Sequence, residues 1–239
     1  MKKDIFKRIQ KGWKLRGKFR KLGIKIYGMY WLPIDEWNII YQTINELFIK
    51  YPEANSGSIK WIRVEPKRYF VSAGLPNSDL AAAGFHRNRF LSQIVNAYEE
   101  IGIVINKDEF RNIEVYERIL DKKVTHNIFI RFIITHEFGH LIDLIISGYK
   151  KESRRYVDAD LLSGKYGRQV SEKIVNSSLR KCYGTLDIQD EILEKEIGSD
   201  VENNNGEIFA ESVALEYCGL GTTLSNMIIR EYYQYLKDS

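Results

Sequence analysis

The stretch THEFGHLID, residues 135–143, is the most informative part of this chain of 239 residues. His136 and His140 are four positions apart, so on a helix of 3.6 residues per turn both imidazoles lie on one face and can bind one metal ion. Glu137 projects about 100° round the same helix, beside a metal-bound water. Imidazole nitrogen suits Zn²⁺, and a carboxylate can take a proton from zinc-bound water as it attacks a carbonyl. The pattern predicts a zinc site with Glu137 as general base. The alternative is a buried helix whose two histidines only form hydrogen bonds.

A candidate for the third ligand lies in the segment NGEIFAESVALEY, residues 205–217. Glu207 and Glu211 are four positions apart and therefore share one face of a second helix. Apolar residues such as Phe209 and Val213 repeat at the same spacing, so much of this helix is expected to be buried. Buried carboxylates need partners, and a metal or a ligand histidine would provide one. The alternative is a pair of exposed glutamates on a solvated face.

Together, THEFGHLID and EIFAESVA resemble the zinc endopeptidase domain of anthrax lethal factor and its relatives, which include the secreted Pro-Pro endopeptidases of clostridia. The resemblance covers these two short segments. It implies that His136, His140 and Glu207 are the zinc ligands and that Glu137 is the base. It also implies that Glu211 orients a ligand histidine, a role in which a carboxylate fixes the tautomer and raises the basicity of the imidazole.

Two features depart from the pattern of that family. The family has a tyrosine seven residues before the ligand glutamate, where it helps to stabilise the transition-state oxyanion, and this chain has Asp200 there. An ionised carboxylate cannot donate a hydrogen bond, so either another donor such as Tyr183 or Tyr166 replaces the tyrosine or turnover is weakened. The step of 67 residues from His140 to Glu207 is longer than expected and predicts a helical insert at about residues 149–200.

Composition and charge indicate a folded chain with a basic N-terminus. With 44% hydrophobic residues, the length fits one catalytic domain, residues 31–239, preceded by an extension, residues 1–30. The extension holds 11 Lys or Arg and one Asp. It can serve as an arm for a polyanion such as nucleic acid, for an anionic membrane surface or for an acidic partner. The alternative is a solvated tail or a clamp along the domain, and the core helices are expected to begin at about Asp35.

Compartment and cysteine chemistry follow from two further patterns. No apolar run reaches the length of a membrane span, and the N-terminus lacks the apolar centre of a secretory signal. We therefore expect an intracellular or bacteriophage-encoded protein, or one exported by another route. Cys182 and Cys218 are too few for a disulfide framework, so two reduced, partly buried thiols are favoured over a bridge.

Periodicity and turn signals predict the remaining elements. A helix should run from Asp35, its N-cap, to about Lys50, and two strands, Ser58–Val64 and Lys67–Ser72, should pair around Glu65-Pro66. The strand Ile101–Ile105 is either an edge strand that holds an extended substrate or an ordinary buried strand. Further helices are expected at four places: from Thr125 or Asn127 to about Ser147, Asp160–Cys182, Ile188–Ile197 and about Thr222–Lys237, the last packed on the Glu207 helix.

The predicted fold class is therefore α+β and mostly helical, a zincin-like metalloprotease with a small sheet and a central HExxH helix. The predicted function is zinc-dependent endopeptidase action on a protein or peptide substrate, toxin-like or bacteriophage-encoded, with Glu137 taking a proton from water and returning it to the leaving amine. One alternative is a catalytically weak or inactive zincin-fold module for assembly or binding with a structural zinc, which Asp200 supports. Another is the metallopeptidase group that cleaves phage repressors, whose downstream Ala-Asn-x-Phe-Ala segment matches EIFAES less well.

Overall fold

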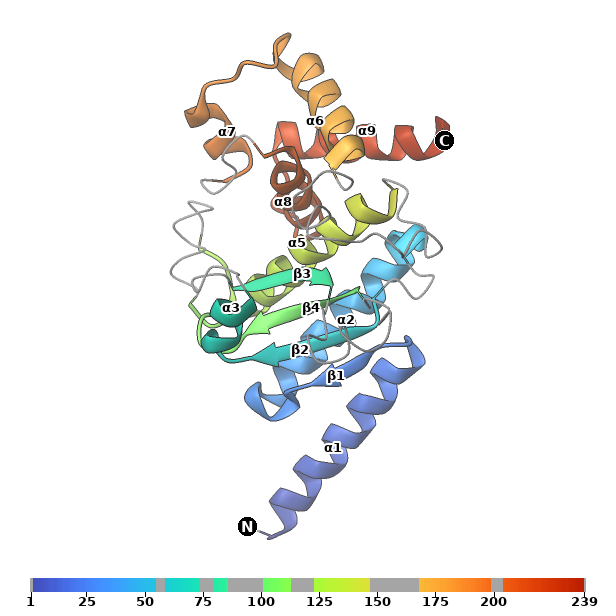
Figure 1. Ribbon diagram of the computed structural model, residues 1–239, viewed down its shortest axis with the longest axis vertical. Helices are drawn as coiled ribbons and strands as arrows, with labels where there is room; N and C mark the ends of the chain where they lie inside the picture. Colours follow the sequence, from blue (N-terminus) through green and yellow to red (C-terminus); the bar gives the residue numbers. More distant parts are fainter. Residues whose placement is uncertain are drawn as a thin grey trace. The chain divides into compact units, whose positions relative to one another are not determined.

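The computed structural model describes residues 2–54, 59–73, 80–85, 101–112, 123–146, 168–198 and 204–238 (Figure 1). The chain forms two compact units, residues 1–111 and residues 112–239, each described here by itself. The described residues are mostly helical and include a small mixed sheet, which confirms the predicted α+β class. None of the helices in these ranges is both long and apolar enough to cross a membrane.

The first unit contains a four-stranded sheet in the order β1-β2-β4-β3. Strands β1 (Lys25–Tyr27), β2 (Trp61–Glu65) and β4 (Ile101–Asn106) are parallel, and β3 (Ala81–Phe85) pairs antiparallel with β4. β-Branched and aromatic side chains favour these segments because they pack well on a pleated surface. β4 lies between β2 and β3, so its backbone is paired on both sides. The prediction of an edge strand at Ile101–Ile105 is therefore wrong, and the alternative of an ordinary buried strand holds.

Two long helices belong to the first unit. Helix α2 (Ile34–Lys50) begins one residue before Asp35, which therefore lies in the first turn and is not the N-cap. Its buried side chains include all those that the periodicity predicts: Trp37, Ile40, Ile44, Leu47 and Phe48.

Helix α1 (Lys2–Lys21) packs on α2 through Phe19, whose ring meets those of Trp37 and Tyr41 edge-on at 5.9 and 5.4 Å. Leu15 and Phe19 are buried. The hydrophobic core therefore starts well before Asp35, contrary to expectation.

The segment after β2 is a helix where the sequence predicts a strand. Helix α3 spans Lys67–Ala73, directly after Pro66. The backbone N–H of Lys67 donates to the carboxylate of Asp108 at 2.8 Å, and the Lys67 ammonium meets Glu109 at 3.1 Å. A carboxylate from 41 positions away thus satisfies an N–H group of the first turn. The aromatic pattern alone cannot reveal that partner, so the predicted strand Lys67–Ser72 is wrong.

The second unit is helical in its described part. It comprises α5 (His126–Ile146), α6 (Arg168–Tyr183), α7 (Asp190–Glu196), α8 (Asn205–Tyr217) and α9 (Thr223–Asp238), joined as Figure 1 shows. Helix α8 contacts α5, α6 and α9, so the expected packing of α9 on the Glu207 helix is confirmed. Helices α6 and α7 lie within the range of the predicted insert, whose limits stay a prediction. Residues 149–167, including the predicted helix start at 160, lie outside the described residues.

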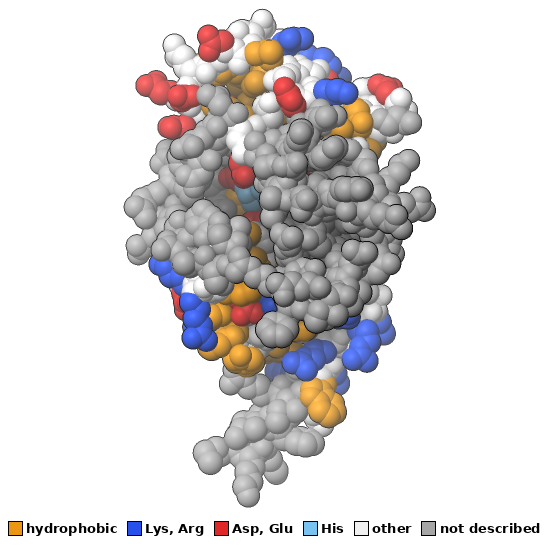
Figure 2. All heavy atoms as spheres, viewed as in Figure 1, with side chains coloured by type: hydrophobic (Ala, Val, Ile, Leu, Met, Phe, Trp, Pro, Cys, Tyr) orange, Lys and Arg blue, Asp and Glu red, His pale blue; other side chains and the backbone are white. Residues whose placement is uncertain are grey.

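Charge and thiol state can be assigned to each unit. Residues 1–111 contain 20 Lys or Arg against 11 Asp or Glu, whereas residues 112–239 contain 16 against 21. Figure 2 shows blue basic side chains prominent among the described residues of the first unit. Cys182 and Cys218 are free and half-buried, which confirms the prediction of two unbridged thiols. Burial raises the pKa of the Cys218 thiol to about 12, so it stays protonated at neutral pH.

Candidate metal centre

The two predicted site helices pack against each other at a glycine. Gly139 lies in the middle of α5, and a Cβ atom added to it would meet the Cα of Ala210 in α8 at 2.6 Å. The absence of a side chain thus lets the two helix backbones approach closely. Thr125 begins α5 by accepting the N–H of Ile128 at 3.3 Å, as predicted, and Asn204 caps α8 by accepting the N–H of Gly206 at 3.1 Å. These caps and the close approach hold the two helices in register.

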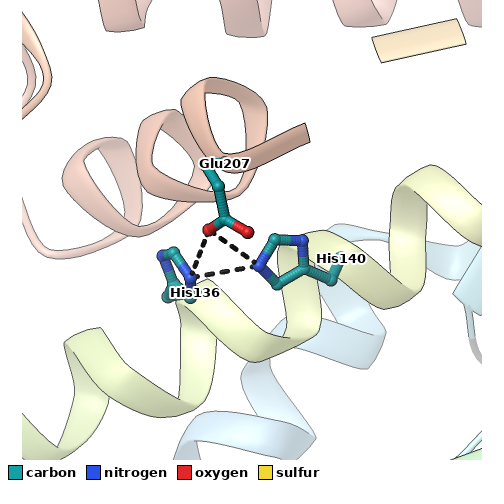
Figure 3. Close-up of side chains that lie close together, drawn as sticks. All are labelled: His136, His140 and Glu207. Atoms are coloured by element: carbon teal, nitrogen blue, oxygen red, sulfur yellow. Dashed lines mark hydrogen bonds and ion pairs between the residues drawn. The ribbon is translucent and has the colours of Figure 1, made fainter. Parts of the chain in front are cut away.

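Three side chains from these helices converge at this contact. The Nε2 atoms of His136 and His140 are 3.1 Å apart, and Oε2 of Glu207 lies 3.3 and 3.2 Å from them (Figure 3). Zinc bonds of about 2.0–2.1 Å at tetrahedral angles place ligand atoms about 3.3 Å apart. The observed triangle therefore fits the face of a tetrahedral zinc site. The two imidazole nitrogens and one carboxylate oxygen are also a usual donor set for a catalytic zinc ion.

Glu211 supports this group from one turn further along α8. Its Oε2 lies 2.7 Å from Nδ1 of His136, and its side chain is buried. When zinc is bound, His136 Nδ1–H donates to this carboxylate, so the lone pair of Nε2 points to the ligand triangle. The two glutamates, which the sequence placed on one helix face, thus contact opposite nitrogens of one imidazole.

The protonation of the metal-free group follows from these contacts. Burial by itself opposes a charge on His136, but the hydrogen bonds to Glu207 and Glu211 outweigh it and raise the pKa of His136 well above its ordinary value. Burial likewise opposes a charge on Glu207, but its hydrogen bonds to His136 and His140 lower the pKa of Glu207 far below its ordinary value. Without metal, a proton on His136 therefore takes the place of a cation among the carboxylates.

Glu137 lies next to the ligands without being one of the three. It is only 6% exposed, and its charge contributes to the raised pKa of His136, so it is close to the ligand group. Asp143, at the end of the quoted stretch, is also buried, and its Oδ1 accepts the backbone N–H of Ser171 at 3.1 Å. It thereby anchors α6 on the site helix. The sequence signal for this role was an acidic residue in an apolar helix, which the motif analysis passed over.

The expected oxyanion donors are not part of the group in Figure 3. Tyr183 ends α6, where burial and then the charges of Glu196 and Cys182 raise its pKa. Its role as a donor stays a prediction. Tyr166 and Asp200 lie outside the described residues.

No known protein family matches this chain, and no match was found among curated proteins or solved structures. The resemblance to lethal-factor-type endopeptidases therefore depends on the two short segments alone, and membership of the zincins stays a prediction.

Proposed function

We propose that this protein is a zinc-dependent endopeptidase. The observation that carries the proposal is the convergence of His136, His140 and Glu207, within 3.3 Å of one another, beside the buried carboxylate of Glu137. These three side chains would hold the metal. The expected class is a zincin-like metalloprotease with a protein or peptide substrate.

Each residue has a distinct task in this proposal. A bound zinc ion would supply Lewis-acid polarisation of the scissile carbonyl and a lowered pKa for water. Glu137 accepts the proton of the attacking water on a carboxylate oxygen and returns it to the leaving amine nitrogen. Glu211 keeps His136 in the tautomer that leaves Nε2 free. The low exposure of Glu137 favours this proton transfer, because burial raises the proton affinity of a carboxylate.

Solvent access to the ligands favours a catalytic zinc ion over a structural one. The side chains of His136, His140 and Glu207 are 16%, 27% and 36% exposed. A structural zinc site is typically closed by four protein ligands, whereas a catalytic site keeps a position open for water. Three ligands with partial exposure agree with the second arrangement. A structural zinc in an assembly or binding module is the competing function.

The test compares wild type with Glu137→Gln. This change keeps the side-chain volume and the three ligands but removes the base, so zinc content and thermal stability should stay near wild type. Cleavage of a broad peptide library should fall by about 10² or more. Glu172→Gln, at an exposed position on α6, is the matched control and should leave cleavage unchanged.

The two functions give different results. Cleavage by wild type that is lost in Glu137→Gln supports the peptidase. Stoichiometric zinc with no cleavage by wild type supports the structural module, and recovered cleavage in Asp200→Tyr would then identify a degenerate protease. Equal cleavage by wild type and Glu137→Gln would contradict the role of Glu137.

A further inference from the structure

The first unit exposes four large aromatic side chains. Trp13 and Tyr30 are 74% and 75% exposed, and Tyr27 and Trp31 are 41% and 38% exposed. Exposed aromatic rings leave apolar area in water, and where they gather they commonly mark an interaction surface. We call these four residues the aromatic cluster.

The members of the aromatic cluster come from neighbouring elements. Tyr27 ends strand β1, and Tyr30 and Trp31 belong to the short 3-10 helix η1 (Met29–Trp31), with ring centroids 4.6 Å apart. Between them Gly28 adopts a left-handed conformation with φ 68° and lies against the carbonyl of Val64, so the chain turns directly from β1 into η1. Trp13 follows Gly12 in α1, and Gly12 lies against the side chain of Met29. The α1 helix is thus joined to η1.

Cations lie over two of these rings. Nζ of Lys107 is 4.3 Å from the ring centroid of Trp31, and the guanidinium of Arg63 is 4.9 Å from that of Tyr27. Carboxylates balance them locally, because Lys107 pairs with Asp108 at 2.9 Å and Arg63 pairs with Glu65 at 3.5 Å. The cations here therefore hold the rings in place by cation–π contact but add little net charge.

The net positive charge comes from the outer side of α1. Because Leu15 and Phe19 are buried, the helix has a fixed orientation, and its exposed cations form what we call the basic face: Lys11, Lys14, Arg16, Lys18, Arg20 and Lys21. Trp13, Arg16 and Arg20 follow one another at spacings of three and four residues, so an exposed ring and two cations share one side of the helix. Basic charge and stackable rings therefore occur on the same element.

We infer that the basic face and the aromatic cluster together bind single-stranded nucleic acid. Phosphates would contact the cations of α1, and unpaired bases would stack on the exposed rings, the two contacts that recur in sequence-tolerant binding of single strands. A duplex offers the same phosphates, but its bases are already stacked and cannot use the rings. An anionic membrane fits less well, because the apolar residues Leu15 and Phe19 of α1 are already buried within the protein and leave no apolar stripe to insert.

Binding is measured with the full chain and labelled oligothymidine and oligouridine of about 15 nucleotides, with an equal-length duplex and vesicles of phosphatidylserine and phosphatidylcholine as competitors. Single strands should bind and quench tryptophan emission through stacking. The duplex should compete about tenfold less well, since it lacks the stacking contribution. The affinity should fall steeply between about 50 and 200 mM salt.

Matched variants separate stacking from charge. Trp13→Ala and Tyr30→Ala should each weaken single-strand binding about tenfold, whereas Ile49→Ala, which removes another side chain that is 75% exposed in this unit, should have no effect. The double variant Lys11→Glu/Lys14→Glu should flatten the salt dependence of log K by about 1.4, at about 0.7 for each phosphate contact. Lys173→Glu/Arg180→Glu makes the same change in net charge at exposed positions of α6 and should leave the slope unchanged.

Three results would overturn the inference. They are absence of binding at low salt, tighter binding to the vesicles than to either oligonucleotide, and loss of affinity in Trp13→Ala and Tyr30→Ala no greater than in Ile49→Ala. Zinc content and peptide cleavage should be unchanged in all these variants, because none of the substituted residues belongs to the metal centre. The inference and the proposed peptidase function can therefore fail independently.

Discussion

Nδ1 of His136 lies 2.7 Å from Oε2 of Glu211, so a residue of α8 holds the ring of a residue of α5. The opposite nitrogen of the same ring lies 3.3 Å from Glu207 and 3.1 Å from His140. One imidazole thus connects both glutamates with the second histidine. The position of α8 on α5 therefore decides whether the site can hold a metal ion.

Removal of the Glu211 carboxylate should weaken zinc binding. Glu211→Ala leaves Nδ1 of His136 without its buried acceptor, so the ring loses its fixed tautomer, and zinc affinity should fall about 10- to 100-fold in a chelator competition. Glu211→Gln retains an acceptor oxygen and should fall less. Glu216→Ala, later on the same helix, is the control. Equal affinity in Glu211→Ala and wild type would show that this contact does not orient His136.

Loss of a ligand should have a larger effect than loss of its support. His140→Ala and Glu207→Ala should each lower the zinc content of the purified protein sharply, because two remaining ligands bind zinc poorly at neutral pH. Metal analysis gives the stoichiometry, and Glu191→Ala on α7 is a control for removal of an exposed carboxylate. If Glu207→Ala retains its zinc, Glu207 is not a ligand, and Glu211 or Asp200 becomes the next candidate.

Addition of one methyl group at Gly139 should disturb the site without a change in any ligand. Its Cβ would meet the Cα of Ala210 at 2.6 Å, so α5 and α8 would have to move apart. Gly139→Ala should destabilise the protein by about 1–3 kcal/mol and lower zinc affinity. Gly17→Ala is a useful contrast, because nothing lies within 4 Å of its added Cβ in α1. It should raise stability by up to about 1 kcal/mol in urea unfolding. Equal effects of the two changes would contradict close packing at Gly139.

The pH dependence of stability should have opposite signs with and without zinc. In the metal-free protein the pKa of His136 is raised by Glu207 and Glu211 against the effect of burial. Its stabilising contribution is complete below the ordinary histidine pKa of about 6.5 and is lost as pH rises through the folded-state value. The lowered pKa of Glu207 acts at the other end, since its contribution is present above about pH 4.3 and is lost on acidification.

Thermal unfolding with a chelator tests this dependence. The Tm of the zinc-free protein should fall as pH rises above about 6.5, and His136→Gln should remove that fall. With zinc the imidazoles must be deprotonated, so the stabilisation by zinc should increase over the same range. A Tm of the zinc-free protein that does not fall with rising pH would contradict the arrangement of His136 between two carboxylates.

Part of the N-terminal basic segment should be essential for the stability of the first unit. Phe19 is fully buried against Trp37 and Tyr41, so Phe19→Ala should cost about 3–5 kcal/mol in urea unfolding. Trp13→Ala, on the same helix but 74% exposed, should change stability by less than about 0.5 kcal/mol. If Phe19→Ala is as stable as wild type, residues 1–30 are a separable extension, as the charge pattern suggested.

Much of the architecture was predictable because its signals are local. The apolar spacing of residues 34–50 predicts α2 and the side chains that it buries. The long apolar segment around HEFGH predicts α5 as a central helix, and Thr125 predicts its start. Such patterns follow from 3.6 residues per turn and from caps a few positions away, so a short window contains all the information.

Other features depended on residues far apart in the chain. The segment Lys67–Ala73 is a helix in the presence of Asp108, and Ile101–Asn106 is an inner strand because β2 and β3 pair on its two sides. The exposed aromatic cluster was equally hidden, since sequence alone does not show which rings the core leaves uncovered. Composition and spacing contain little information about pairing between distant segments.

The metal centre shows the same division. The sequence by itself determined that His136 and His140 share a helix face with Glu137 beside them, because that relation is a property of one helix. Only the tertiary structure decided that Glu207, 67 positions after His140, lies 3.2 Å from it. The physical reason is that this distance depends on the close approach of two helix backbones at Gly139 and Ala210, and packing between distant segments sets that approach.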